Sequence, residues 1–479
     1  MARENNIRLP YSLLLLCGAL AVSGTLVSYA QTVAAQEGLP EAPPVQLLAV
    51  LQARSTPAPS ATSAASPASL GAERLTRTQA EQMAIKNNPR VSIGRLLALA
   101  QQQVVRETRS AELPTATASM TAEDAEDGSR ISAGSLTASR LLTHAGAGMG
   151  ITQLITDFGR TRNLVASSKL QQKAQYANAL ATTEDIVMAT DQAFYAALQA
   201  QALVKVAQQN VTTLQTTQTQ VSQMTNNKLK STLDLSFANV NLSQAKLLQL
   251  DAQNNADSTL AALDAVLGFD REVTYDLSED NTTPQPPPPD PDQLIQLGLQ
   301  QRPDLQALNY SQQAAIKFSH AQSDQRLPSI TAAATAGSVP IRPTAYYTEN
   351  WWAAAGVNVN IPVFNGFLYS AQAKEAAIRA QAASEQSREL KDKIVRDIRT
   401  AWLAANTAFQ RVGVTAELLK QANMTLGLAQ TRYQLGLSSI VELSQAQYQQ
   451  IDAAIANTNA QYQYQLSLAA LNYQVGTTP

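Results

Sequence analysis

The sequence is poor in cysteine, histidine, aromatic residues and charge, and each shortage excludes a class of protein. One Cys and two His among 479 residues exclude a disulfide scaffold and a Cys-rich zinc protein. The 35 Lys and Arg against 37 Asp and Glu lack the basic excess of a nucleic-acid-binding protein. Aromatic residues make up 5% and charged residues 15% of the chain, too little bulk for several compact cores. We therefore expect thin walls wetted on more than one side, or helices that pack small residues densely.

Glycine and proline are both absent from residues 160–267, which predicts long helices. Apolar residues recur at helical spacing among many Ala, Gln and Thr, and residues 225–228 are the one turn-like break. The first helix, residues 160–224, would be about 100 Å long at about 1.5 Å per residue. This stretch is therefore expected to form an antiparallel helical hairpin.

One unit of about two hundred residues occurs twice in the sequence. Matching residues recur in it at equal spacing, which is the mark of an internal repeat. The Pro89 and Pro114 pair recurs as Pro303 and Pro328 at the same separation. Matching residues further along the chain predict that the second unit ends with its own helical hairpin: a helix over 369–433, a turn at Gly436 and a return helix to about Val475. Gly413 and Gly427 are expected to interrupt this hairpin mildly.

Five segments follow from these patterns. Residues 1–30 have the charged start, apolar run and small residues of an export signal, and residues 31–73 form a Pro-, Ala- and Ser-rich tether. The first repeat spans 74–279, a Pro-rich linker spans 280–291, and the second repeat spans 292–479.

The apolar run of the export signal leaves two alternatives open. A membrane anchor is one, although the run is short for a span. A lipoprotein signal at Cys17 is the other, although Leu16 is large where such signals need a small residue. We expect cleavage without lipid, so that the mature chain has no Cys.

Alternating polar and small apolar residues predict two strands before each helical hairpin. The alternation runs over 115–122 and 149–155 in the first repeat, and over 329–336 and 351–363 in the second. Strands of about ten residues with one apolar face have the length and pattern of an outer-membrane barrel. Four strands cannot close a barrel, and an open edge cannot persist in lipid, so other copies must complete it. Three chains would supply twelve strands.

Four aromatic residues lie near the turn of the second strand pair, where a membrane-interface girdle is expected. They are Tyr346, Tyr347, Trp351 and Trp352. A packed loop cluster is the alternative.

The ordered set of features in both copies resembles the TolC family of outer-membrane efflux proteins. The resemblance runs from about Leu75 to Gly476 and includes residues 150–160 and their counterpart 356–366. It implies a mainly α-helical homotrimer, with long antiparallel hairpins as a periplasmic helical barrel and four strands per chain in a twelve-stranded outer-membrane β-barrel. It also implies a passive exit duct for efflux or type I secretion, with a periplasmic adaptor and an inner-membrane RND or ABC transporter as partners.

The resemblance also implies a periplasmic gate at the tips of the helical hairpins. Asp234 matches the family's acid after the first turn, and Tyr433 matches the Tyr that bonds with it. Glu442 matches the first of two acids at the aperture. Gln445 stands in place of the second acid, and Ser438 in place of a linking Arg. From the residues alone, acids beside such turns are most often helix caps or solvated groups.

The sequence predicts no enzyme, cofactor or metal site. His144 and His320 have no second ligand at a metal-binding spacing, and Asp157-Phe158-Gly159 lacks the rest of a kinase signature. A phosphate-binding Gly loop and a nucleophile elbow do not occur. The alternative to a channel is a periplasmic coiled-coil adaptor outside the membrane, which normally has one helical hairpin.

Overall fold

The computed structural model describes residues 73–125, 130–133, 136–140, 143–269, 275–278, 285–342 and 349–477. The expected export signal, nearly all of the tether, the start of the linker, and Tyr346 and Tyr347 lie outside the described residues.

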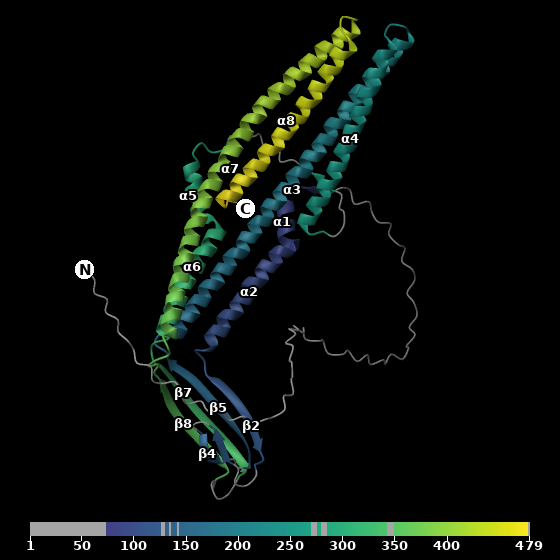
Figure 1. Ribbon diagram of the computed structural model, residues 1–479. Helices are drawn as coiled ribbons and strands as arrows, with labels where there is room; N and C mark the ends of the chain where they lie inside the picture. Colours follow the sequence, from purple (N-terminus) through teal and green to yellow (C-terminus); the bar gives the residue numbers. More distant parts are fainter. Residues whose placement is uncertain are drawn as a thin grey trace, which may run out of the picture. The chain divides into compact units, whose positions relative to one another are not determined.

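The helices occur as two sets of four with equal lengths. In the first half, α1 (Arg77–Asn87), α2 (Pro89–Ser110), α3 (Arg160–Asn226) and α4 (Thr232–Leu267) have 11, 22, 67 and 36 residues. In the second half, α5 (Pro291–Gln301), α6 (Pro303–Asp324), α7 (Leu368–Gln434) and α8 (Ile440–Val475) have the same lengths. The two long hairpins, α3–α4 and α7–α8, run side by side in Figure 1. Both predicted hairpins are confirmed.

Local sequence explains where these helices begin and end. Proline occupies the first turn of α2, α5 and α6, where its missing N–H is not needed. Gly268 and Gly476 end α4 and α8 in the left-handed conformation that glycine adopts without strain. Helix α7 continues through Gly413 and Gly427, so neither glycine interrupts it.

The predicted strands form one antiparallel sheet. Strands β2 (Thr115–Glu123), β5 (His144–Thr156), β7 (Ser329–Ile341) and β8 (Trp351–Asn360) lie in the order β2-β5-β7-β8. The two repeats therefore meet at the β5–β7 pairing, in the middle of the sheet. The structure adds a small hairpin that the sequence did not predict, β3 (Arg130–Ala133) with β4 (Leu136–Arg140).

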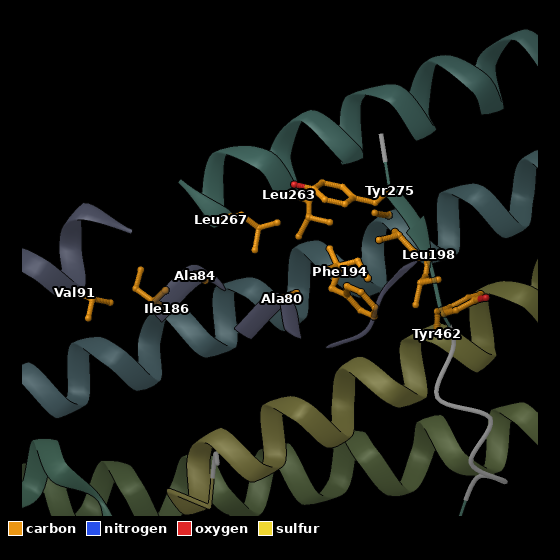
Figure 2. Close-up of a cluster of buried hydrophobic side chains, with 13 residues drawn as sticks. Ala80, Ala84, Val91, Ile186, Phe194, Leu198, Leu263, Leu267, Tyr275 and Tyr462 are labelled. Atoms are coloured by element: carbon orange, nitrogen blue, oxygen red, sulfur yellow. The ribbon is translucent and has the colours of Figure 1, made fainter. Parts of the chain in front are cut away.

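A two-stranded parallel sheet joins the start of the first repeat to its end. It pairs β1 (Glu73–Leu75) with β6 (Tyr275–Leu277) and brings Leu75, Tyr275 and Leu277 into a buried cluster between α1, α3 and α4. Figure 2 shows Phe194 and Leu198 of α3 and Leu263 of α4 in this cluster, with Tyr462 reaching in from α8. We call it the middle cluster; its buried members are Leu75, Ala80, Ala84, Val91, Ile186, Phe194, Ala197, Leu198, Leu263, Leu267, Tyr275, Leu277 and Tyr462.

Small residues fill most of the helix contacts elsewhere. Helix α3 contacts α2, α4, α6 and α8 along its length, and α7 contacts α5, α6 and α8. Most buried residues of α7 are alanine, for example Ala376, Ala405 and Ala429, and alanine lets helix axes approach closely. In the described part of the chain, no helix is both long enough and apolar enough to cross a bilayer.

Candidate functional site

The four-stranded sheet has one apolar and one polar face, because residues paired across neighbouring strands point to the same side. The apolar face carries Ala116, Ala118, Met120, Met149, Ile151, Ala334, Ala336, Trp351, Ala353, Ala355, Val357 and Val359. The polar face carries Thr115, Thr117, Ser119, Thr121, Thr152, Thr331, Thr335, Asn358 and Asn360.

The apolar face is uncovered within the described chain. The side chain of Met120 is 88% exposed, and that of Val357 is 68% exposed. Apolar surface left in water forgoes roughly 25 cal/mol per Å² of stabilisation. A row of such residues over four strands is a contiguous patch, and patches of this kind mark a partner or a membrane surface.

The two adjacent tryptophans of β8 face opposite sides of the sheet. Trp351 pairs with Ser338 in line with Met120, whereas Trp352 pairs with Gly337 on the polar face. A Cβ atom added at Gly337 would lie 2.9 Å from the Trp352 ring, so the glycine makes room for the indole. Alternation along the strand therefore puts Trp352 on the side away from the apolar face, and a place for it or for Trp351 in a membrane-interface girdle stays a prediction.

At the other end of the helices, the predicted acids occupy equivalent positions in the two hairpins. Asp234 lies in the first turn of α4, where its backbone N–H donates to Ser231 Oγ at 3.2 Å. Glu442 lies in the first turn of α8, and its N–H donates to Ser439 Oγ at 3.3 Å. A carboxylate at this position is stabilised by the helix N-terminus, so each acid has a local role whether or not it belongs to a gate.

The tips of the two hairpins pack against each other through a small core. We call it the tip cluster; its buried members are Val221, Ala238, Ala429, Tyr433, Ile440, Leu443 and Ala446, with Leu235 and Leu426 beside them. All four long helices contribute to it. The cluster therefore joins α3–α4 to α7–α8 within one chain.

Tyr433 is the largest residue of the tip cluster and the one with an unsatisfied group. Its side chain is only 4% exposed, and its hydroxyl has no hydrogen-bond partner in the described part of the chain. Burial raises the pKa of Tyr433, and the negative charge of Asp234 raises it further. The structure thus brings Tyr433 and Asp234 into electrostatic reach, without the hydrogen bond between them that the resemblance implies. The Oγ of Ser438 is buried without a partner in the same described region.

Other polar contacts at the tips were not predicted from the sequence. Arg432 pairs with Glu442 at 3.0 Å within the second hairpin, while Gln445 is exposed.

Near the tips, neutral hydrogen bonds between described residues cross from one hairpin to the other. Asn241 donates to Ser444 Oγ at 2.7 Å, and the Gln447 amide donates to Thr217 Oγ1 at 3.1 Å. Amides and hydroxyls are spread over every face of these helices, so no periodic signal distinguishes the few that bond.

A charged group in the middle of the helices joins the two repeats. Arg302, between α5 and α6, makes two hydrogen bonds to Asp304 at 2.6 and 3.1 Å. Tyr473 of α8 donates to Asp185 of α3 at 2.5 Å. Burial, followed by the charge of Asp304, raises the pKa of Glu184 to about 7.

The described residues contain no group of three or more His, Cys, Asp or Glu able to hold a metal ion. His144, at the start of β5, has Nδ1 3.9 Å from Glu123 Oε2 on the neighbouring strand. His320 lies within α6.

Comparison with known proteins places this architecture. The family model described as outer membrane efflux protein matches residues 81–269 and 294–477. The chain is 22% identical over 351 residues to outer membrane protein TolC of Salmonella enteritidis, covering 69% of each chain. It is 23% identical over 409 residues to outer membrane efflux protein BepC of Brucella suis biovar 1, covering 83% of this chain and 84% of that one.

Solved structures agree in fold. The chain matches CusC with a TM-score of 0.73 at 17% identity, over 84% of this chain and 92% of that one. It matches outer membrane protein VceC of Vibrio cholerae with a TM-score of 0.70 at 18% identity, over 84% and 96% of the two chains. The alternative of a soluble adaptor is not favoured. The chain belongs to the outer membrane efflux protein family, as an efflux channel of the cell outer membrane whose helices form a tunnel in the periplasm.

Proposed function

We propose that three copies of this chain form a passive exit duct, with a twelve-stranded barrel in the outer membrane above a helical tunnel. The observation that carries this proposal is the four-stranded sheet, whose outer strands β2 and β8 each have one strand neighbour in the described chain. An open edge and an exposed apolar face are both removed when the sheet closes with other copies in lipid. The polar face then lines a water-filled interior.

In this proposal the energy for transport comes from a partner. The sequence has no phosphate-binding loop, and the duct would receive its substrate from an inner-membrane RND or ABC transporter through a periplasmic adaptor. The system would be a tripartite efflux pump or a type I secretion apparatus. The long periplasmic hairpins place a contact surface far from the outer membrane, where such partners would meet it.

The tips of the hairpins would close the duct at rest. Asp234 and Tyr433 would hold the first hairpin to the second, and Glu442 would belong to the ring of polar residues at the aperture together with Gln445 and Ser438. Each neutral hydrogen bond adds only about 1 kcal/mol net, so loss of a few would open the tips. Movement of the tips would leave the middle cluster unchanged.

The test is conductance in planar bilayers. Protein extracted from outer membranes should run as a heat-labile trimer on gels and conduct weakly. Tyr433→Phe combined with Asp234→Ala should raise the conductance several-fold. The matched control is Tyr448→Phe combined with Asp251→Ala, which changes residues on exposed positions of α8 and α4. A soluble monomer would refute the duct, whereas a trimer with unchanged conductance would refute these two residues as the lock.

A further inference from the structure

A charged contact crosses from the first hairpin to the second at the tips. Lys230 lies in the turn between α3 and α4, and its Nζ is 4.2 Å from the centroid of the Tyr433 ring near the end of α7. The turn places it there because Lys228 adopts a left-handed conformation with φ of 64° and reverses the chain. Ser231 then caps α4 and fixes the start of the return helix.

The Tyr433 ring and Lys230 are both at least partly shielded from water, which strengthens the contact between them. Tyr433 is almost fully buried in the tip cluster, and Lys230 is itself partly buried. A cation over an aromatic face is held more strongly when both are shielded from water. Arg432, the other cation close to Tyr433 in sequence, pairs with Glu442 inside the second hairpin and so does not join the hairpins.

We propose that Lys230 is a positioning residue of the closed tips, acting on the Tyr433 ring from the opposite hairpin. This inference rests on the proposed closure of the duct at the tips. The first hairpin would engage Tyr433 in two ways: through the Lys230 ammonium group on the ring face, and through the negative charge of Asp234 nearby.

The experiment compares three lysine variants in single trimers in planar bilayers. Lys230→Met removes the charge and keeps most of the side chain, and we expect conducting events to become about fivefold more frequent, roughly 1 kcal/mol at about 1.4 kcal/mol per factor of ten. Lys230→Arg keeps a cation for the ring and should behave like the unmodified protein. Lys228→Met, two residues earlier at an exposed position, is the matched control and should also leave conductance unchanged.

The outcomes separate this inference from the proposed function. If Lys230→Met conducts like the unmodified trimer while the Tyr433 and Asp234 double variant opens, the role of Lys230 is overturned and the gate stands. If neither opens the duct, closure at the tips is wrong. If Lys230→Arg opens the duct as much as Lys230→Met, the cation is not the acting group and the inference fails. Heat-labile trimers on gels confirm assembly for every variant.

Discussion

The middle cluster and the tip cluster both lie between the long helices, but they differ in the number and size of their buried side chains. In the middle, Phe194, Leu263 and Leu267 are all 1% exposed or less, and other segments of the chain pack around them. At the tips the cluster is smaller: three of its seven buried residues are alanine, and its largest side chain, Tyr433, has a hydroxyl without a partner in the described region.

This difference indicates where the helices can separate locally. Burying a Leu or Phe side chain contributes about 1.5–3 kcal/mol, whereas an alanine contact contributes much less. Local opening concentrates where few apolar contacts hold the chain. We therefore expect the middle cluster to fix the assembly while the tips separate and close.

The largest expected effect comes from emptying the middle cluster. Phe194→Ala removes a fully buried ring from α3, and we expect it to lower the free energy of unfolding by about 3–5 kcal/mol. The midpoint of thermal unfolding in detergent measures this loss. Leu418→Ala, at an exposed position of α7, is the control and should change it little. Equal shifts in the two variants would contradict the role of the middle cluster.

A smaller loss is expected from breaking the charged group that joins the repeats. Arg302→Met leaves Asp304 without its partner beside the half-buried Glu184, at a cost of about 2–3 kcal/mol. Arg399→Met is the control, because Arg399 is exposed and pairs with Asp292 at 3.5 Å. Exposed pairs of that kind contribute about 0–1 kcal/mol. If both arginine variants unfold at the same temperature, the charged group around Arg302 does not stabilise the contact between the two repeats.

The same group predicts a pH dependence. Burial raises the pKa of Glu184 from 4.5 to about 7, so the folded chain holds this proton more tightly than the unfolded chain does. Its contribution is complete below pH 4.5 and is lost as the pH rises through 7. Because Glu184 is only half-buried and solvent screens its charge, the loss is about 1–2 kcal/mol.

Unfolding midpoints measured from pH 5 to pH 8 test this dependence. Glu184→Gln should flatten the fall in stability over that range. An equal fall with pH in both proteins would assign the dependence to other groups.

The smallest effect is expected at the tips. Asn241→Ala with Ser444→Ala removes one hydrogen bond between the hairpins, worth about 0.5–1.5 kcal/mol. Hydrogen exchange should become faster in the first turns of α4 and α8, while global unfolding stays nearly unchanged. The two single variants complete a double-mutant cycle. A shift in global unfolding as large as that of Phe194→Ala would erase the distinction between middle and tips.

The elements of this fold could be predicted because their signals are local. Missing glycine and proline predict α3 and α4, and alternation over residues 115–122 predicts β2. Tertiary neighbours decide the rest. The parallel pairing of β1 with β6 joins segments far apart in the sequence, and neither three-residue strand has a period to read.

The tip residues divide in the same way. The resemblance predicts gate roles for Asp234 and Tyr433, whereas nothing in the sequence predicts the Lys230 contact, because its partner lies on the other hairpin. The strand alternation predicts that Trp352 lies on the polar face, since the neighbouring Trp351 belongs to the apolar alternation. A place for Trp352 at the membrane interface rests on its residue type and not on its register, and it stays a prediction.

The most direct test of the account is the number of chains in the particle extracted from the outer membrane. Native mass spectrometry of the detergent-solubilised protein should give three chains, since four strands per chain then close a barrel. A single chain stable in buffer without detergent would contradict the account, because the apolar face of the sheet would then need no lipid and no sister copies.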